Sequence, residues 1–332
     1  MGGTSSERDV SLATGIRVTD ALRSRGHDVT PVDPARGPIS ANEQRALSSG
    51  TVVQVVPPAP EALRQLAREA LPRLVSNLPR QGDTDVVFLG LHGGSGEDGT
   101  IQSLLDLTGV PYTGSGLLGS ALGWDKDVSK KLFRQAGVGT ADWLMAPASI
   151  DEVRAALGFP VIVKPSKQGS TVGLSIVKQP SELEAAIHEA FQHDDEVMIE
   201  RFIAGRELTV GILGDIALPV GEILPKHEIY DYECKYTPGM AEERFPADLT
   251  PEATARVQDE ARRAFRAMKL SGYARIDFRM AGDGTFYCLE GNTLPGMTQT
   301  SLLPQGAAAA GISFPELCER IVQLALERRG GE

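Results

Sequence analysis

The segment Asp-Val-Val-Phe-Leu-Gly-Leu at residues 85–91 constrains the fold more than any other feature of this chain. It is an almost unbroken apolar run that is too short for a buried helix. Such runs are typical of strands covered on both faces of a parallel sheet. Apolar residues at helical spacing accompany it over residues 9–24, 60–78 and 100–108. The first part of the chain is therefore expected to be an α/β open sheet. Two further short strands are expected, at 28–32 and 51–56.

Two changes of pattern divide the 332 residues into the two or three packed units expected for this length. Glycine and serine dominate residues 114–119, and from residue 205 onward alternation and Gly-Asp turns favour antiparallel strands. We therefore predict three units, at 1–114, 115–199 and 200–332.

The elements expected in the last two units are as follows. The middle unit has helices at 120–136 and 181–192 and strands at 160–164, 173–178 and 196–200. The last unit has strands at 206–213, 216–224, 273–280 and 285–290, and a helix at 315–328.

Charge and composition exclude several classes of partner. The net charge of −11 disfavours nucleic acid, which binds to basic surfaces. No apolar run reaches the roughly 18 residues that span a membrane, and no signal peptide precedes the first glycines. The three cysteines fit neither a zinc site nor a disulfide framework. We therefore expect a cytoplasmic protein with no membrane partner.

The stretch Gly-Ser-Gly-Leu-Leu-Gly at 114–119 matches a dinucleotide-binding fingerprint. That motif requires a buried strand before it and an acidic residue about 20 positions later, at the end of a second strand. Residues 110–112 make a poor strand, and no acidic residue ends a strand at that distance. A glycine-rich turn between units is the better interpretation.

Two strands near the C-terminus are expected to form a hairpin with polar residues on one face. A turn at 281–284 predicts a register in which Asp277 lies opposite Cys288 and Arg275 opposite Glu290. Alternate residues on one strand also share a face. Arg275, Asp277 and Glu290 should therefore project from one surface.

This surface has the chemistry of a magnesium site, provided that Asn292 joins it. Carboxylate and amide oxygens without histidine or cysteine are the ligands that magnesium prefers. A solvated polar face with cross-strand ion pairs is the alternative. The rigid turn Asn-Thr-Leu-Pro-Gly-Met-Thr at 292–298 favours a ligand site, because its backbone N–H groups can approach a bound molecule.

A nucleotide site is expected around residues 160–207. Lys164 ends a buried strand and precedes the small residues of 165–173, whose N–H groups can fold over phosphates. The segment at 197–203 is expected to be a strand running into a linker that could bind adenine through its backbone, and Glu207 could accept ribose hydroxyls. A surface hairpin and ordinary core strands are the alternatives.

Seven segments in this order together resemble the D-alanine–D-alanine ligase family, which has the ATP-grasp fold. The resemblance covers nearly the whole chain. Its segments are 2–11, 91–100, 111–116, 164–173, 230–236, 275–277 and 290–301.

The resemblance implies roles for the residues on the amino-acid side of the site. Glu7 would hold the ammonium group of the first D-alanine, with His92 beside it. Ser170 would orient both Glu7 and the loop residue Tyr236. The carboxylate of the second D-alanine would bind Ser301 and Leu302, and Arg275 and the Gly296 amide would stabilise the oxyanion.

The resemblance also implies the nucleotide and metal sites. Two Mg²⁺ (or Mn²⁺) ions would bind Asp277, Glu290 and Asn292. The ATP-binding residues would be Lys126, Lys164, Ser170, Thr171, Glu200, Arg201, Phe202, Ile203, Glu207 and Lys235.

The family's reaction joins two D-alanines at the expense of ATP, through a D-alanyl phosphate, for peptidoglycan precursors. The implied assembly is a homodimer. The implied units are an N-terminal substrate domain followed by central and C-terminal ATP-grasp lobes.

Some residues depart from the family pattern, and other functions stay open. Met1 stands where the family has a short strand, Leu294 replaces a frequent serine, and Thr300 replaces a frequent histidine. Tyr236 favours an amine acceptor over D-lactate. The alternatives are D-alanyl-D-lactate synthesis, ligation of another amino acid, a noncatalytic nucleotide-binding module and a dehydrogenase.

Overall fold

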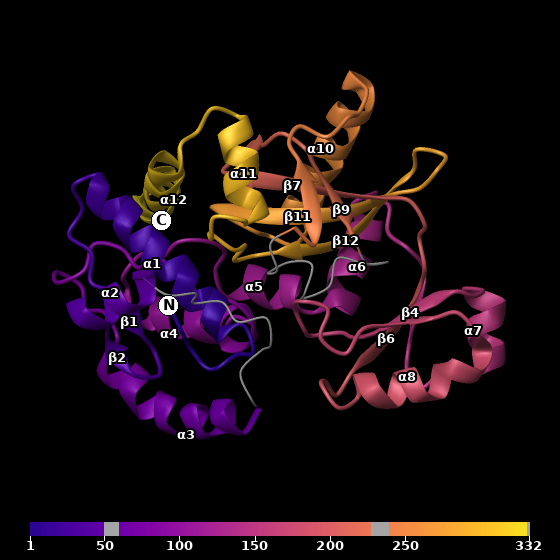
Figure 1. Cartoon of the computed structure of the whole chain (residues 1–332), viewed down its shortest axis with the longest axis horizontal. Coiled ribbons are helices and arrows are strands. Elements are labelled where there is room, and N and C mark those ends of the chain that lie inside the picture. The colour runs from indigo at the N-terminus through magenta and orange to yellow at the C-terminus, as the bar shows by residue number, and fades with distance from the viewer. Residues whose placement is uncertain (50–59, 227–238, 331–332) are drawn as a thin grey trace.

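The computed structural model describes residues 1–49, 60–226 and 239–330. Figure 1 shows an N-terminal unit, a central lobe built on β4 and β6, and a C-terminal sheet with its covering helices. The three surround a shared middle region, where the chain crosses from one unit to the next.

The N-terminal unit is mostly helical around irregular segments. The predicted helices are present as α1 (Arg8–Ser24), α3 (Pro60–Ser76) and α4 (Thr100–Thr108), and α2 (Ala41–Ser49) adds a fourth. The short strands β1 (Val32–Asp33) and β2 (Gly37–Pro38) pair with each other. The strand expected at 51–56 lies outside the described residues.

The expected strand at 85–91 is realised only in part. In the described residues it forms one parallel bridge, between Val87 and Tyr112. A cavity of about 900 Å³ lies against its other edge and is lined by residues 27–32 as well as 85–91. In the described residues no β-ladder joins these two segments.

The central lobe is a four-stranded antiparallel sheet in the order β3-β6-β4-β5. Its strands are β3 (Trp143–Met145), β4 (Val161–Pro165), β5 (Ser175–Val177) and β6 (Val197–Arg201), packed with α7 (Ile150–Ala156) and α8 (Leu183–Ala190).

One helix predicted in this lobe is in fact two. The stretch expected at 120–136 divides into α5 (Leu117–Trp124) and α6 (Lys126–Gln135). Asp125 separates them with extended backbone, and its side chain caps α6 by accepting a hydrogen bond from the Val128 amide.

The C-terminal sheet has the order β10-β9-β7-β11-β12, with β8 beside β7. Its strands are β7 (Arg206–Leu213), β8 (Ile216–Ala217), β9 (Gly221–Pro225), β10 (Ala241–Arg244), β11 (Tyr273–Met280) and β12 (Phe286–Asn292). The single strand expected at 216–224 is thus two. The helices are α10 (Pro251–Ala267), α11 (Leu302–Ala309) and α12 (Phe314–Gly330), and the sequence pattern predicted only the last.

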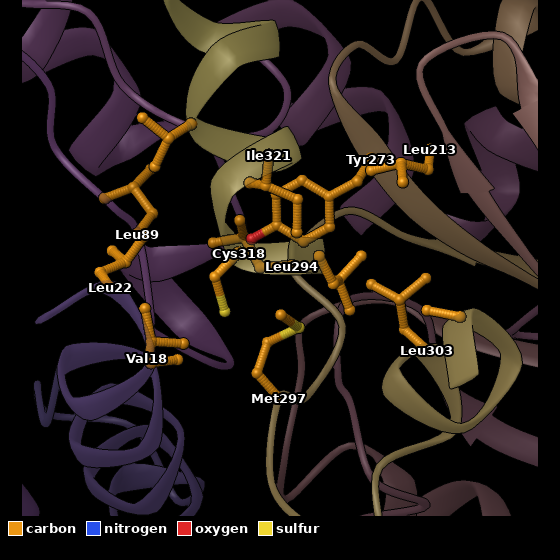
Figure 2. Packing of buried hydrophobic residues seen from close by; sticks show 14 of the residues in the cluster. Val18, Leu22, Leu89, Leu213, Tyr273, Leu294, Met297, Leu303, Cys318 and Ile321 are labelled. Carbon is orange, nitrogen blue, oxygen red and sulfur yellow. The ribbon is translucent and has the colours of Figure 1, made fainter. Parts of the chain in front are cut away.

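The largest core joins the two ends of the chain. Val18 and Leu22 of α1 belong to the same buried cluster as Tyr273 of β11 and Cys318 of α12. Figure 2 shows Cys318 between the α1 residues and Tyr273. The central lobe has a separate core, made of residues from α7, α8 and its own strands. The N-terminal unit and the C-terminal sheet are therefore packed as one body, to which the central lobe is attached.

No helix in the described part of the chain is long and apolar enough to cross a membrane.

Candidate active site

The polar face of β11 and β12 is present, but its register differs from the prediction. Asp277 lies opposite Glu290, and Arg275 lies opposite Asn292. The expected pairing of Asp277 with Cys288 is wrong, as is that of Arg275 with Glu290. Because directly opposed residues share a face, the two carboxylates still project on the same side of the sheet.

A β-bulge accounts for the difference. Phe278 pairs with Cys288 and the preceding residue, Asp277, pairs with Glu290, so Leu289 is an additional residue in β12. Leu289 and Glu290 consequently both line the same cleft. Bulges redirect side chains in this way, and an alternating sequence pattern does not reveal them.

The donor set on this face fits a magnesium ion. Asp277 is nearly buried and accepts a hydrogen bond of 2.7 Å from the Thr209 hydroxyl. Among the described residues, the buried Asn292 Oδ1 has no hydrogen-bond partner. In the described ranges, no three His, Cys, Asp or Glu side chains come together as a metal-binding group. The candidate ligands here are two carboxylates and one amide. An unpaired buried oxygen beside two carboxylates is suited to a hard cation.

Two basic side chains already contact these carboxylates. Arg275 donates to Asp277 through Nε at 3.0 Å and Nη2 at 2.8 Å, and Lys126 Nζ lies 3.3 Å from Glu290. Cations and acids therefore alternate along the cleft wall.

Glu7 lies at the opposite side of the same cleft, at the start of α1. Ser170 Oγ donates a hydrogen bond of 2.5 Å to its carboxylate. A Cβ atom on Gly93, whose φ is +70°, would lie 2.8 Å from Glu7 Oε2, so only glycine leaves room for the carboxylate. The loop at 165–173 and helix α1 therefore meet at this carboxylate.

The glycine-rich loop reaches Glu7 in a strained conformation. Ser170 and Thr171 have φ angles of 51° and 60°, in the left-handed region that non-glycine residues rarely adopt. Strain of this kind is maintained by surrounding contacts and concentrates at functional sites. Both residues line the cleft.

Hydrogen bonds of His92 link helix α1, next to Glu7, to the loop after β12. Its Nε2 lies 2.8 Å from the Thr14 hydroxyl, and its Nδ1 lies 2.8 Å from the Leu294 carbonyl. A carbonyl can only accept, so Nδ1 carries a proton. Glu97 Oε1 lies 3.8 Å from the same ring nitrogen. Burial raises the pKa of Glu97, and the charge of Glu7 adds to the effect.

The loop at 294–301 supplies the predicted acceptor residues. Gly296, Ser301 and Leu302 line the cleft with Glu7. Ser301 Oγ accepts a hydrogen bond of 2.9 Å from the Thr298 amide, and α11 begins at Leu302. The end of this loop thus presents a hydroxyl beside a helix N-terminus, an arrangement suited to a carboxylate.

Two buried lysines lie in the other half of the cleft. Lys164 Nζ donates to Glu200 at 2.7 Å, and Lys126 Nζ donates to the Gln168 carbonyl at 2.6 Å. Lys130, which sequence analysis did not select, is fully buried and donates to the other oxygen of Glu200. Burial would raise the pKa of Glu200, but the charges of Lys164 and Lys130 outweigh it and hold the pKa below its ordinary value.

The segment between β6 and β7 forms an apolar end to the cleft. Phe202, Ile203 and Glu207, which were assigned to the adenosine site from the sequence, line this end. Arg201 lines it too, although its guanidinium contacts Asp142 at 3.1 Å.

Arg279 also lines this end and was not predicted. Its Nη1 lies 3.2 Å from Glu207, and its Nε donates to the Ile203 carbonyl at 3.2 Å. Alternation along β11 with Arg275 and Asp277 was the signal that could have identified it, since alternate residues share a face. Glu97 could have been identified from its place in the His-Gly-Gly-Ser-Gly-Glu-Asp-Gly segment.

The two halves of the cleft are continuous, because Lys126, Ser170, Arg275 and Glu290 line both. One end offers acidic and hydroxyl groups, the middle offers cations beside two carboxylates, and the far end is apolar. Lys235 and Tyr236 lie outside the described residues. The arrangement can hold a polyanion between a small zwitterion and an aromatic base.

Comparison with known families gives two matches. The family model described as "D-ala D-ala ligase N-terminus" matches residues 1–115, and the one described as "D-ala D-ala ligase C-terminus" matches residues 132–323.

Individual relatives match over nearly the whole chain. A D-alanine–D-alanine ligase of Geobacter sulfurreducens is 44% identical over 325 residues, 97% of this chain and 91% of the relative. One of Halalkalibacterium halodurans is 40% identical, with 98% of each chain covered.

Solved structures of the same kind superpose well. A Bacillus anthracis D-alanine–D-alanine ligase complexed with ATP is 35% identical with a TM-score of 0.75, covering 100% of this chain and 96% of that one. The VanG D-Ala:D-Ser ligase of Enterococcus faecalis is 30% identical with a TM-score of 0.80, covering 98% and 97%. These structures have the ATP-grasp fold expected from the sequence.

Proposed function

The chain belongs to the D-alanine–D-alanine ligase family, and we propose that the cleft described above carries out this family's reaction. Each residue of the cleft has a separate role in that reaction. The protein is a ligase that uses ATP to join two D-alanines into D-alanyl-D-alanine for cell-wall synthesis. One observation carries the residue assignments: side chains from all three predicted units meet in one continuous cleft.

Glu7 binds the ammonium group of the first D-alanine, and Ser170 fixes the carboxylate of Glu7 by its 2.5 Å hydrogen bond. His92 closes this side of the subsite. The buried position of Glu7 excludes competing water and strengthens its attraction for a cation.

The carboxylate of this D-alanine is a poor acyl donor until the γ-phosphoryl group of ATP is transferred to it. The product of that transfer is D-alanyl phosphate, with phosphate as the leaving group. Lys126 and Lys164 hold the triphosphate, and their charges offset the negative charge on its oxygens. Glu200, Arg201, Phe202 and Ile203 surround adenine, Glu207 accepts the ribose hydroxyls, and Thr171 and Lys235 complete the nucleotide contacts.

Asp277, Glu290 and Asn292 would hold Mg²⁺ (or Mn²⁺), in the two-ion arrangement expected for the family. The metal, when bound, would neutralise charge on the phosphate oxygens. The unpaired Oδ1 of Asn292 supports this assignment, among the described residues.

The amine of the second D-alanine attacks the acyl phosphate, and its carboxylate binds Ser301 and Leu302. Arg275 and the Gly296 amide donate hydrogen bonds to the tetrahedral oxyanion. Arg275 is held by Asp277, so its guanidinium is already oriented toward the reacting centre. Water would hydrolyse the acyl phosphate, and the loops at 165–173 and 229–245, the second with Tyr236, exclude it.

We further propose the three units as an N-terminal substrate domain (1–114), a central ATP-grasp lobe (115–199) and a C-terminal lobe (200–332). The protein would act in the cytoplasm as a homodimer on small-molecule substrates alone. Its net charge of −11 supports the exclusion of nucleic acid. Light scattering of the purified protein measures the assembly.

The deciding experiment is ADP release with ATP, Mg²⁺ and D-alanine, compared with L-alanine, D-serine and D-lactate as acceptors. We expect turnover with D-alanine and a dipeptide product by mass spectrometry. ATP that is not consumed at any D-alanine concentration would contradict the proposal, and a preference for D-serine or D-lactate would change the acceptor.

A further inference from the structure

The loop at 294–301, which we call the acceptor loop, is held from outside the cleft by α1. Arg17 Nη1 donates to two of its carbonyl oxygens, that of Met297 at 2.9 Å and that of Thr298 at 2.5 Å. The Arg17 guanidinium also lies 3.6 Å from the centre of the Phe314 ring. These contacts fix the guanidinium on one side by stacking and on the other by hydrogen bonds.

A second attachment comes from one helical turn earlier. The Met297 amide donates to the Thr14 hydroxyl at 3.2 Å, and Thr14 and His92 are hydrogen-bonded to each other. His92 in turn donates from Nδ1 to the Leu294 carbonyl. The Met297 amide can only donate, so the Thr14 hydroxyl oxygen accepts from it. Every group in this chain of contacts has a partner.

Side-chain packing secures the same part of the loop. Leu294 and Met297 are almost fully buried in the large core, near Val18 and Cys318. Arg17 therefore acts on the short stretch that contains Gly296 and leads to Ser301. Arg17 itself does not line the cleft.

We propose that Arg17 is a positioning residue for the second D-alanine, because it fixes the backbone that carries the Gly296 amide and the Ser301 hydroxyl. This inference rests on the proposed function. Within that function, binding of the second D-alanine depends on Arg17, whereas binding of ATP does not. Among the described residues, the proposed ATP-binding residues line the other half of the cleft, whereas the hydrogen bonds of Arg17 go to Met297 and Thr298.

The test compares Arg17→Met, Arg17→Lys and a matched control, Arg25→Met. Arg25 follows α1 directly as its C-cap residue, and its guanidinium lies 3.7 Å from Glu319 of α12 rather than at the acceptor loop. Methionine keeps the apolar cover over Phe314 and removes both hydrogen bonds. Lysine keeps the charge and one donor group.

For Arg17→Met we expect the KM of the second D-alanine to rise about tenfold, the size expected for losing a charge-assisted hydrogen bond. The KM of ATP should stay unchanged. Positional isotope exchange in ¹⁸O-labelled ATP, which reports acyl-phosphate formation from the first D-alanine alone, should also stay unchanged. Arg17→Lys should recover part of the loss, and Arg25→Met should resemble the wild type.

The inference is overturned if folded Arg17→Met raises the KM of the second D-alanine and the KM of ATP equally, or if it leaves the KM of the second D-alanine unchanged. If Arg17→Met does not fold, Arg17→Lys decides by the same comparison. Wild-type protein that fails to ligate D-alanine contradicts the proposed function instead. The two failures are therefore distinguishable.

Discussion

At the scale of single residues, Asp277 shows how the site is organised before a ligand binds. Its carboxylate accepts hydrogen bonds from Thr209 and from Arg275. Thr209 therefore helps to fix Asp277, and Asp277 in turn fixes the guanidinium of Arg275. Sequence reasoning selected Asp277, Glu290 and Asn292 by residue type and spacing. It could not anticipate that Thr209, on the neighbouring strand β7, would hold the first of them.

We predict that Asp277→Asn lowers phosphate release by at least about a hundredfold, because an amide neither attracts a cation as strongly nor pairs with Arg275. Arg275 loses its ion-pair partner, so the melting temperature should also fall, and activity is measured well below it. A phosphate-release assay with D-alanine measures the loss. Asp283→Asn, in the exposed hairpin turn, is the control and should retain activity. Full activity of Asp277→Asn would remove Asp277 from the proposed metal site.

Asp33 has a structural role that can be measured separately. It forms a buried ion pair with Arg8 at 2.5 Å and accepts hydrogen bonds from the Gly3 and Ala35 amides. Asp33→Asn should lower the free energy of unfolding by about 3 kcal/mol, since the Arg8 charge is left buried without its partner. Urea denaturation measures this change, and a loss below about 0.5 kcal/mol would contradict it.

The same pair predicts a pH dependence. Burial alone would raise the pKa of Asp33, but the hydrogen bond and charge of Arg8 outweigh it and hold the pKa below its ordinary value. A carboxyl with a lowered pKa stabilises the folded state above its unfolded pKa of about 3.9, and this contribution is lost as the pH falls below that value. Unfolding curves from pH 5 to pH 2 should therefore converge for wild type and Asp33→Asn.

At the scale of elements, the bulge in β12 is the feature that most affects the site. It allows consecutive residues, Leu289 and Glu290, to line one cleft. We predict that deletion of Leu289 restores a regular ladder and leaves Glu290 opposite Asp277. The deletion variant should fold, but its KM for ATP should rise several-fold because the apolar wall of the nucleotide subsite is lost. Leu289→Ala is the matched control and should show a smaller rise. A deletion variant with wild-type ATP affinity would contradict this account of the bulge.

The elements that sequence predicted best are those with strong periodicity. The helices α1, α3 and α12 and the strands β7, β11 and β12 were expected close to their observed bounds. The register of β11 and β12 was wrong, because a bulge leaves no trace in alternation. The segment at 85–91 has the composition of a fully paired strand, yet pairing depends on a neighbour at the right distance. Residues 85–91 instead line a cavity together with residues 27–32.

At the scale of the whole molecule, two of the separate buried cores predict two unfolding units. Leu183 of α8 belongs to the core of the central lobe, and Ile321 of α12 belongs to the core that joins α1 to the C-terminal sheet. Each is almost fully buried, so replacement by alanine should cost about 2–5 kcal/mol.

The two substitutions should speed hydrogen exchange in different elements. Leu183→Ala should speed hydrogen exchange in β4 and β6 and leave α1 and α12 as in the wild type. Ile321→Ala should do the reverse, with faster exchange in α1, far away in sequence. Mass-spectrometric hydrogen exchange of both variants measures this. Equal acceleration throughout the molecule would indicate one cooperative unit.

The uneven burial of the acceptor loop has a consequence for inhibitors that bind the cleft. Leu294 and Met297 are buried, whereas Gln299 and Thr300 are exposed at the tip. A bacterium under selection by such a compound can alter the tip without loss of folding, but substitutions at the base would damage the core as well as the subsite. Compounds whose affinity depends on the Gly296 backbone should therefore be harder to escape than compounds that rely on the tip.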